Sequence, residues 1–154
     1  MMRFLENKIP PPIIALLCAA GMWAITRAVE PLEIQTSFKW ALIVMCIAAG
    51  AGFAIAGVLA FRRHHTTINP LHPEKTSSLV TGGIYRISRN PMYVGMAMLL
   101  LAWAVFLDSP AALLGIGAYI AYITRFQIIP EERQLSQHFG VAFAAYRQRV
   151  RRWL

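Results

Sequence analysis

The sequence predicts an all-α integral membrane protein with four transmembrane helices, the third and fourth as a tight hairpin, plus a cytosolic C-terminal amphipathic helix. Of the 154 residues, 57% are hydrophobic and only 14% are charged. In soluble domains, roughly 45–50% of the residues are hydrophobic and about 25% are charged. Four apolar runs, at 11–29, 38–61, 91–107 and 111–129, fit the length of about 17–25 residues that a spanning helix needs. We treat 1–154 as a single domain.

The first two runs (1–61) form an N-terminal helical pair. Prolines at positions 10–12 suit the entry of the first helix. The second run carries Gly50, Gly52 and Gly57 among alanines. Small residues let membrane helices approach closely, so we expect helix packing here. The alternative is that these glycines let the backbone approach a cofactor.

The third and fourth runs are joined by Asp108, Ser109 and Pro110, which predict a tight turn. We therefore expect a closely packed antiparallel hairpin. Its two ends opposite the turn should lie close together in space.

The charges predict the orientation in the membrane. The formal net charge is +8, and the basic residues concentrate in the loop 62–90 and in the tail. The positive-inside rule then places this loop and both termini in the cytoplasm. Basic residues at membrane borders without a recognition motif do not indicate nucleic-acid binding. We expect membrane lipids as partners, and the loop is long enough to be functional rather than a simple connector.

The tail 131–153 has apolar residues at helical spacing, which predicts an amphipathic helix. One interpretation is a helix lying on the membrane surface, with arginines toward anionic headgroups. The other is a helix packed on the protein's own cytosolic face. Gly140 is expected to bend or break it. The apolar positions are Leu135, Phe139, Phe143, Tyr146, Val150 and Trp153.

The first candidate site is the segment 81–95, TGGIYRISRNPMYVG. Asn90 can cap the third helix, and Pro91 suits its first turn. Gly82 and Gly83 permit a close approach of backbone to a ligand. Free helix N–H groups beside arginines can bind an anion such as a carboxylate. The alternative is an aromatic and arginine belt at the membrane interface.

The second candidate site is Arg125 followed by Pro130, Glu131 and Glu132, where the fourth helix leaves the bilayer. The hairpin should bring these carboxylates to face the segment that contains Arg89. Paired carboxylates can bind an ammonium or a sulfonium, or act as a base. They can also simply oppose the dipole of a helix N-terminus.

The histidines do not predict a metal site. Their spacing matches neither H-E-x-x-H nor a zinc finger, and carboxylates that could complete a site are sparse. The four are His64, His65, His72 and His138.

The two candidate segments in this order, GIYRISRNPMY and then PEERQLSQHFGVAFAAYRQRV, resemble the isoprenylcysteine carboxyl methyltransferase and phospholipid methyltransferase superfamily. The upstream FRRHHTTINPLHPEKTSSLVTGG resembles its bacterial members. The resemblance implies an integral enzyme of the bacterial inner membrane that uses S-adenosyl-L-methionine and releases S-adenosyl-L-homocysteine. Residues 62–154 would be its cofactor-binding core.

The resemblance also implies roles for particular residues. Phe139, Gly140 and Tyr146 match a pattern that closes the family's pocket. Where the eukaryotic prenylcysteine enzymes have R-H-P, this chain has Asn90, which cannot titrate like histidine. We expect Arg89, Glu132 and Arg125 to act in catalysis. The cofactor-binding residues would be Gly83, Tyr85, Arg89, Asn90, Pro91, Tyr93, Glu131, Glu132 and Tyr146.

The predicted function is methyl transfer to a lipophilic small molecule at the cytosolic membrane border. Arginine suits the cofactor's carboxylate, and a glutamate suits its ammonium. Tyrosine rings can attract its sulfonium by about 0.5–2 kcal/mol. The product is either a carboxyl ester or an N-methylated amine. The alternative is a non-catalytic lipid-binding or assembly protein that shares the fold.

Overall fold

The computed structural model describes residues 6–32, 35–63 and 79–154, and every regular element within these ranges is helical. The all-α prediction is therefore confirmed for the described part of the chain. The elements are α1 (Pro11–Thr26), α2 (Thr36–Arg63), η3 (Gly83–Arg86), α3 (Pro91–Phe106), η4 (Pro110–Ala112), α4 (Leu113–Ile123), η5 (Thr124–Ile128) and α5 (Ile129–Arg149).

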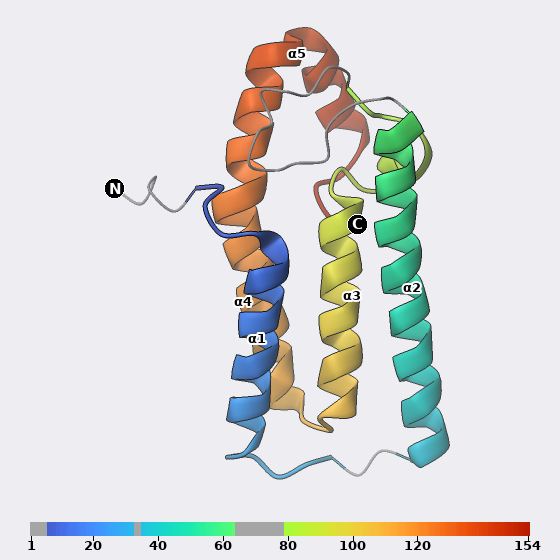
Figure 1. The fold of residues 1–154 in the computed structure, drawn as a ribbon, viewed down its shortest axis with the longest axis vertical. Helices are drawn as coiled ribbons and strands as arrows, with labels where there is room; N and C mark the ends of the chain where they lie inside the picture. The colour runs from blue at the N-terminus through green and yellow to red at the C-terminus, as the bar shows by residue number, and fades with distance from the viewer. Residues whose placement is uncertain (1–5, 33–34, 64–78) are drawn as a thin grey trace.

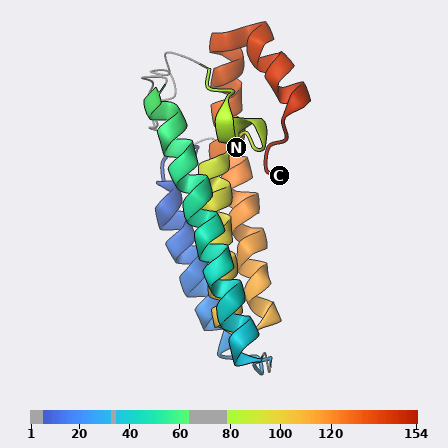
Figure 2. The ribbon, with the colours of Figure 1, turned by 90° about the vertical axis from the view of Figure 1, so that its right-hand side faces the viewer.

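The helices α1, α2 and α3 and the continuous column α4–η5–α5 stand side by side, and each runs in the opposite direction to the one before it (Figure 1). The connection from α1 to α2 and the turn before α4 lie at one end of the bundle. The starts of α1 and α3 lie toward the other end, beyond which α5 extends (Figures 1 and 2). The segment that contains Arg89 is therefore at the same end as α5.

The flanks of the bundle are apolar and exposed. Leu16, Leu17, Val44 and Leu114 are each more than 60% exposed. Such a surface is typical of contact with lipid. By length and composition, α2 and the column Pro110–Arg149 can cross a membrane, while α1 and α3 are apolar but have 16 residues each. Four spans remain a prediction.

Glycines allow close packing between α2 and α3. A Cβ on Gly50 would lie 2.8 Å from the carbonyl oxygen of Gly95, and one on Gly95 would lie 2.7 Å from that of Gly50. A Cβ on Gly57 would meet Met92, whereas Gly52 has open space around it. The packing interpretation is therefore confirmed for Gly50 and Gly57. It is not supported for Gly52.

The predicted turn between α3 and α4 is present, and Asp108 takes a positive φ of 51° there. Asp108 forms an ion pair with Lys39, and its carbonyl accepts the backbone N–H of Leu32 at 2.5 Å. The expectation of α3 and α4 as the tightly packed pair needs correction, because α3 packs most extensively against α2. The physical reason is that Gly50 and Gly95 bring the backbones of α2 and α3 into direct contact.

The fourth column continues into the tail helix without a break, through the π-helical turn η5. Pro130 has no N–H to donate to the carbonyl of Phe126, four residues earlier, and its ring would crowd that carbonyl. The backbone N–H of Ile129 bonds instead to the carbonyl of Thr124. The carbonyl of Phe126 accepts the N–H of Asn7 at 3.0 Å. Proline therefore opens a π-turn here and does not end the helix.

The tail helix α5 bends sharply at Gly140, where φ is 46° and ψ is −117°. Beyond the bend it returns toward the bundle (Figure 2). The bend was predicted, but the helix ends at Arg149 and does not reach Trp153. The apolar side chains of α5 pack with Val80 and Tyr85, so the helix covers the protein's own surface.

The 150–154 segment, which we call the strap, leaves α5 at Val150 in an extended conformation (φ −125°, ψ 134°).

Candidate functional site

The entry to α3 is shaped by a short helix and a buried tyrosine. Gly83 has a φ of 61°, which favours glycine, and it begins η3. Tyr85 follows and is buried against the edge of the Phe61 ring. Its carbonyl accepts the hydroxyl of Tyr146 at 2.7 Å. Tyr146 thereby ties the returning half of α5 to the α3 entry.

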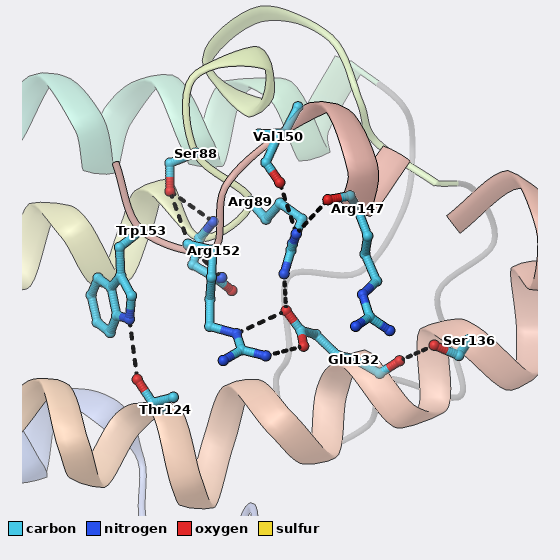
Figure 3. A network of polar contacts seen from close by, with 10 residues as sticks. Ser88, Arg89, Thr124, Glu132, Ser136, Arg147, Val150, Arg152 and Trp153 are labelled. Carbon is cyan, nitrogen blue, oxygen red and sulfur yellow. Dashed lines mark hydrogen bonds and ion pairs between the residues drawn. The ribbon is translucent and has the colours of Figure 1, made fainter. Parts of the chain in front are cut away.

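Arg89 and Glu132 form the centre of the site, as the sequence predicts. Arg89 Nη2 lies 2.5 Å from Glu132 Oε1, and about 10% of each side chain is exposed. Arg89 Nη1 also donates to the carbonyl oxygens of Val150 (2.7 Å) and Arg147 (3.2 Å), at the end of α5 (Figure 3). A cation suits this position, because the carbonyls at a helix C-terminus carry partial negative charge.

A second arginine binds the same carboxylate. Arg152 of the strap places Nη2 2.7 Å from Glu132 Oε2 and Nε 3.1 Å from Oε1 (Figure 3). Burial raises the pKa of Glu132, but the hydrogen bonds from Arg152 and Arg89 outweigh that and leave the pKa below its ordinary value. Glu132 is therefore held as a carboxylate between two guanidinium groups.

Asn90 occupies the N-cap position of α3, but its side chain does not cap the helix. Its Nδ2 donates to the carbonyl of Arg152 at 2.8 Å. The capping prediction is therefore wrong for the side chain, because its amide is oriented by the bond from Nδ2 to the strap and its oxygen accepts no N–H of the first turn. Pro91, as predicted, is the first residue of the helix, and it is buried.

Glu131 has different surroundings from Glu132. It is half-buried and accepts a hydrogen bond of 2.7 Å from the hydroxyl of Tyr93. Burial raises the pKa of Glu131 to about 7, because the hydrogen bond from Tyr93 offsets only part of the cost of burial. No arginine partner is found for Glu131 within the described ranges. The pKa values of the two adjacent glutamates are thus shifted in opposite directions, a separation typical of functional sites.

The raised pKa of Glu131 predicts a pH dependence of stability. Between its ordinary pKa of 4.5 and about 7, the folded protein binds more protons than the unfolded chain. The contribution of Glu131 to stability is therefore full below pH 4.5 and is lost as the pH rises through 7. The advantage of wild type over Glu131→Gln in unfolding midpoint, measured in detergent, should shrink from pH 5 to pH 8. A constant difference would contradict the assignment.

Arg125 lies away from this cluster. Its Nη1 is 3.3 Å from Glu6 Oε1, and Arg133 Nη1 is 3.3 Å from Glu6 Oε2. Both arginine side chains are nearly half exposed. The structure therefore brings Arg89, Asn90 and Glu132 together, with Tyr93 bonded to Glu131 and Tyr146 bonded to Tyr85. Gly83 begins the short helix η3 that precedes them. Arg125 pairs with Glu6 instead, and we propose no catalytic role for it.

A cavity of about 330 Å³ lies beside the cluster, lined by Arg89, Ala144, Arg147 and Gln148. Ligand pockets span about 300–1,000 Å³. The Nε of Arg89 is buried and has no hydrogen-bond partner. The cavity thus has two arginines on its wall and an unused donor nearby, which suits an anionic group.

The sequence prediction missed Arg152 as a site residue. Its only signal was the crowding of arginines at the end of the chain, where Arg147, Arg149 and Arg151 look equivalent. The described residues contain no group of three or more side chains suited to a metal ion. Of the four histidines, only His138 lies within the described residues, and it is exposed.

Several known proteins are similar to part of this chain. An uncharacterized protein of Haemophilus influenzae is 43% identical over 63 residues, which are 41% of this chain and all of that protein. Protein-S-isoprenylcysteine O-methyltransferase A of Arabidopsis thaliana is 33% identical over 98 residues, or 62% of this chain and 48% of the plant enzyme. Protein-S-isoprenylcysteine O-methyltransferase B of the same plant is 29% identical over 93 residues, or 60% of this chain and 47% of that enzyme.

The chain spans about half the length of these plant enzymes. No solved structure gives a significant match. The family model described as phospholipid methyltransferase matches residues 38–142, from α2 to just past the bend of α5. The match includes Arg89, Glu131 and Glu132 and covers more than half of the sequence, so the chain belongs to the phospholipid methyltransferase family.

Proposed function

We propose that this protein is a membrane methyltransferase that uses S-adenosyl-L-methionine to methylate a lipophilic small molecule on a carboxylate or an amine. The observation that carries the proposal is the Arg89–Glu132 pair beside the cavity. Arg89 lies just before α3 and Glu132 lies in α5, 43 residues further along the chain, yet their charged atoms lie 2.5 Å apart. Family membership supports the reaction class.

The residues present fit the cofactor's charged groups. Arg89 and Arg147, on the cavity wall, would hold its carboxylate. Glu131 would hold its ammonium, because Glu132 is already bound by two arginines. The buried, unpartnered Nε of Arg89 is the observation that favours an absent anionic ligand here.

When bound, S-adenosyl-L-methionine would supply a methyl group carried on a positively charged sulfur, and its transfer would leave S-adenosyl-L-homocysteine. Because the carbon is already activated, the chain's residues mainly position the partners and exclude water. A carboxylate acceptor needs no base. An amine acceptor must reach the methyl group in its neutral form and lose a proton as it is methylated.

The acceptor would reach the site from the bilayer, because the cavity end of the bundle adjoins exposed apolar helix surfaces. The proposal places four spans in a bacterial inner membrane with the site and both termini in the cytoplasm. Equal activity on a tail-free, water-soluble acceptor would contradict a lipophilic substrate.

The test is binding of S-adenosyl-L-methionine to the detergent-purified protein by calorimetry, with S-adenosyl-L-homocysteine as competitor. We expect micromolar, competitive binding that weakens at least tenfold in Arg89→Lys. Lysine keeps the charge but cannot reproduce the three hydrogen bonds of the planar guanidinium group. Arg133→Ala is the matched control, because Arg133 pairs with Glu6 on the exposed flank. Absence of binding in folded protein would favour the non-catalytic lipid-binding alternative.

A further inference from the structure

The strap 150–154 crosses the entry of α3 and is hydrogen-bonded to it along the main chain. The backbone N–H of Arg89 donates to the carbonyl of Arg151 at 3.0 Å, and Asn90 Nδ2 donates to that of Arg152 at 2.8 Å. Ser88, which is fully buried, donates its hydroxyl to the same carbonyl at 3.4 Å. Three consecutive residues of the first candidate segment thus depend on the strap for partners.

The far end of the strap is anchored separately. Trp153 Nε1 donates to Thr124 Oγ1 at 3.1 Å, and its ring packs against the core cluster that includes Ile123 and Tyr93 (Figure 3). The strap is therefore held by hydrogen bonds on both sides of Arg152. These bonds restrict the positions that the Arg152 guanidinium can take.

Arg152 determines the orientation of the Glu132 carboxylate. Its two nitrogens contact both oxygens of Glu132, in the fork geometry that fixes the plane of a carboxylate. Arg89 contacts Oε1 alone. Without Arg152, the carboxylate would keep one anchored oxygen and could rotate about it, and the Arg89 guanidinium that lines the cavity would lose its fixed partner.

We propose that Arg152 is a positioning residue of the cofactor site, and that the strap forms the wall that holds the Arg89–Glu132 pair against the cavity. This inference rests on the proposed function, since it assigns Arg152 a part in binding the same cofactor. Arg152 and the strap lie outside residues 38–142, the part matched by the family model. Misplacement of a site by about 1 Å can cost 10²-fold, so a loss of this order is the expected upper range.

The experiment compares Arg152→Gln, Arg152→Lys and Arg151→Gln with wild type. Arg151 is the matched control, because it is the adjacent strap arginine and its side chain is exposed. The first readout is the Kd for S-adenosyl-L-methionine in detergent. The second is hydrogen–deuterium exchange of the peptide that contains the Arg89 amide, which reports on the strap without any ligand.

We expect Arg152→Gln to weaken cofactor binding by about 10–100-fold and to speed exchange at Arg89. Arg152→Lys should recover part of the affinity, because lysine keeps the charge but makes only a point contact. It also keeps the test informative if the glutamine variant is poorly folded. Arg151→Gln should match wild type in both readouts.

Two other outcomes overturn the proposal in distinguishable ways. If wild type binds the cofactor and both Arg152 variants bind it equally well, only the positioning role is wrong, whatever happens to amide exchange. If folded wild type binds neither S-adenosyl-L-methionine nor S-adenosyl-L-homocysteine, the proposed function fails and the role of Arg152 fails with it.

Discussion

Replacing Glu132 by glutamine is expected to destabilise the fold by about 3 kcal/mol and to reduce cofactor binding at least 100-fold. Glutamine keeps the volume but removes the negative charge between Arg89 and Arg152, of which Arg89 is only 10% exposed. Breaking a buried ion pair by removing one partner costs about 3–5 kcal/mol, and the partial exposure of Arg152 favours the lower end. Unfolding in detergent and calorimetric titration measure the two effects.

Glu6 provides the matched control for this change. Its carboxylate also bridges two arginines, Arg125 and Arg133; the Glu6 side chain is itself 13% exposed, but the arginine side chains are 48% and 44% exposed. Because Glu6→Gln would leave both arginines in contact with solvent, it should cost only about 0–1 kcal/mol and should leave cofactor affinity unchanged. Equal stability losses in the two variants would show that the Glu132 cluster is not an interior ion pair.

Replacing Gly95 by alanine is expected to destabilise the fold by about 1–3 kcal/mol, although it adds a single methyl group. The new Cβ would lie 2.7 Å from the carbonyl oxygen of Gly50 and 3.2 Å from the backbone N of Ala54. Both contacts are with backbone, which cannot rotate away, so α2 and α3 must separate. Since α3 begins two residues after Arg89, cofactor affinity should fall as well.

Gly52→Ala serves as the control, because here the added methyl group should not destabilise the fold. Gly52 lies on the same helix as Gly50, but a Cβ added there would have no other atom within 4 Å beyond its own stretch of helix. Alanine is favoured over glycine within a helix by about 0.8–1 kcal/mol, so this variant should be neutral or slightly more stable. Thermal unfolding of both variants in one detergent checks the pair, and similar midpoints would contradict close backbone contact at Gly95.

The sequence alone identified the elements whose signals are local. Apolar runs of membrane-spanning length predicted the four helical columns, and Pro91 marked the start of α3. Two short motifs predicted that Arg89 and the adjacent glutamates would meet. The bend at Gly140 was also foreseeable, because only glycine readily takes its positive φ.

Other features depended on contacts between distant segments. The π-turn before Pro130 forms because Asn7 supplies the hydrogen bond that proline removes from Phe126. The side chain of Asn90 bonds to the strap and not to its own helix, for the same kind of reason. Neither of these hydrogen bonds can be read from the sequence, because each joins residues that are far apart along the chain.

The sequence by itself determined the class of protein, its family and the two halves of the site, because hydrophobicity and motif order are properties of contiguous residues. Only the tertiary structure separated Glu131 from Glu132, excluded Arg125 from the cluster and brought in Arg152. Which charges become neighbours depends on how the helices and the strap pack. Adjacent carboxylates in the same sequence context therefore acquire different partners, and their pKa values shift in opposite directions.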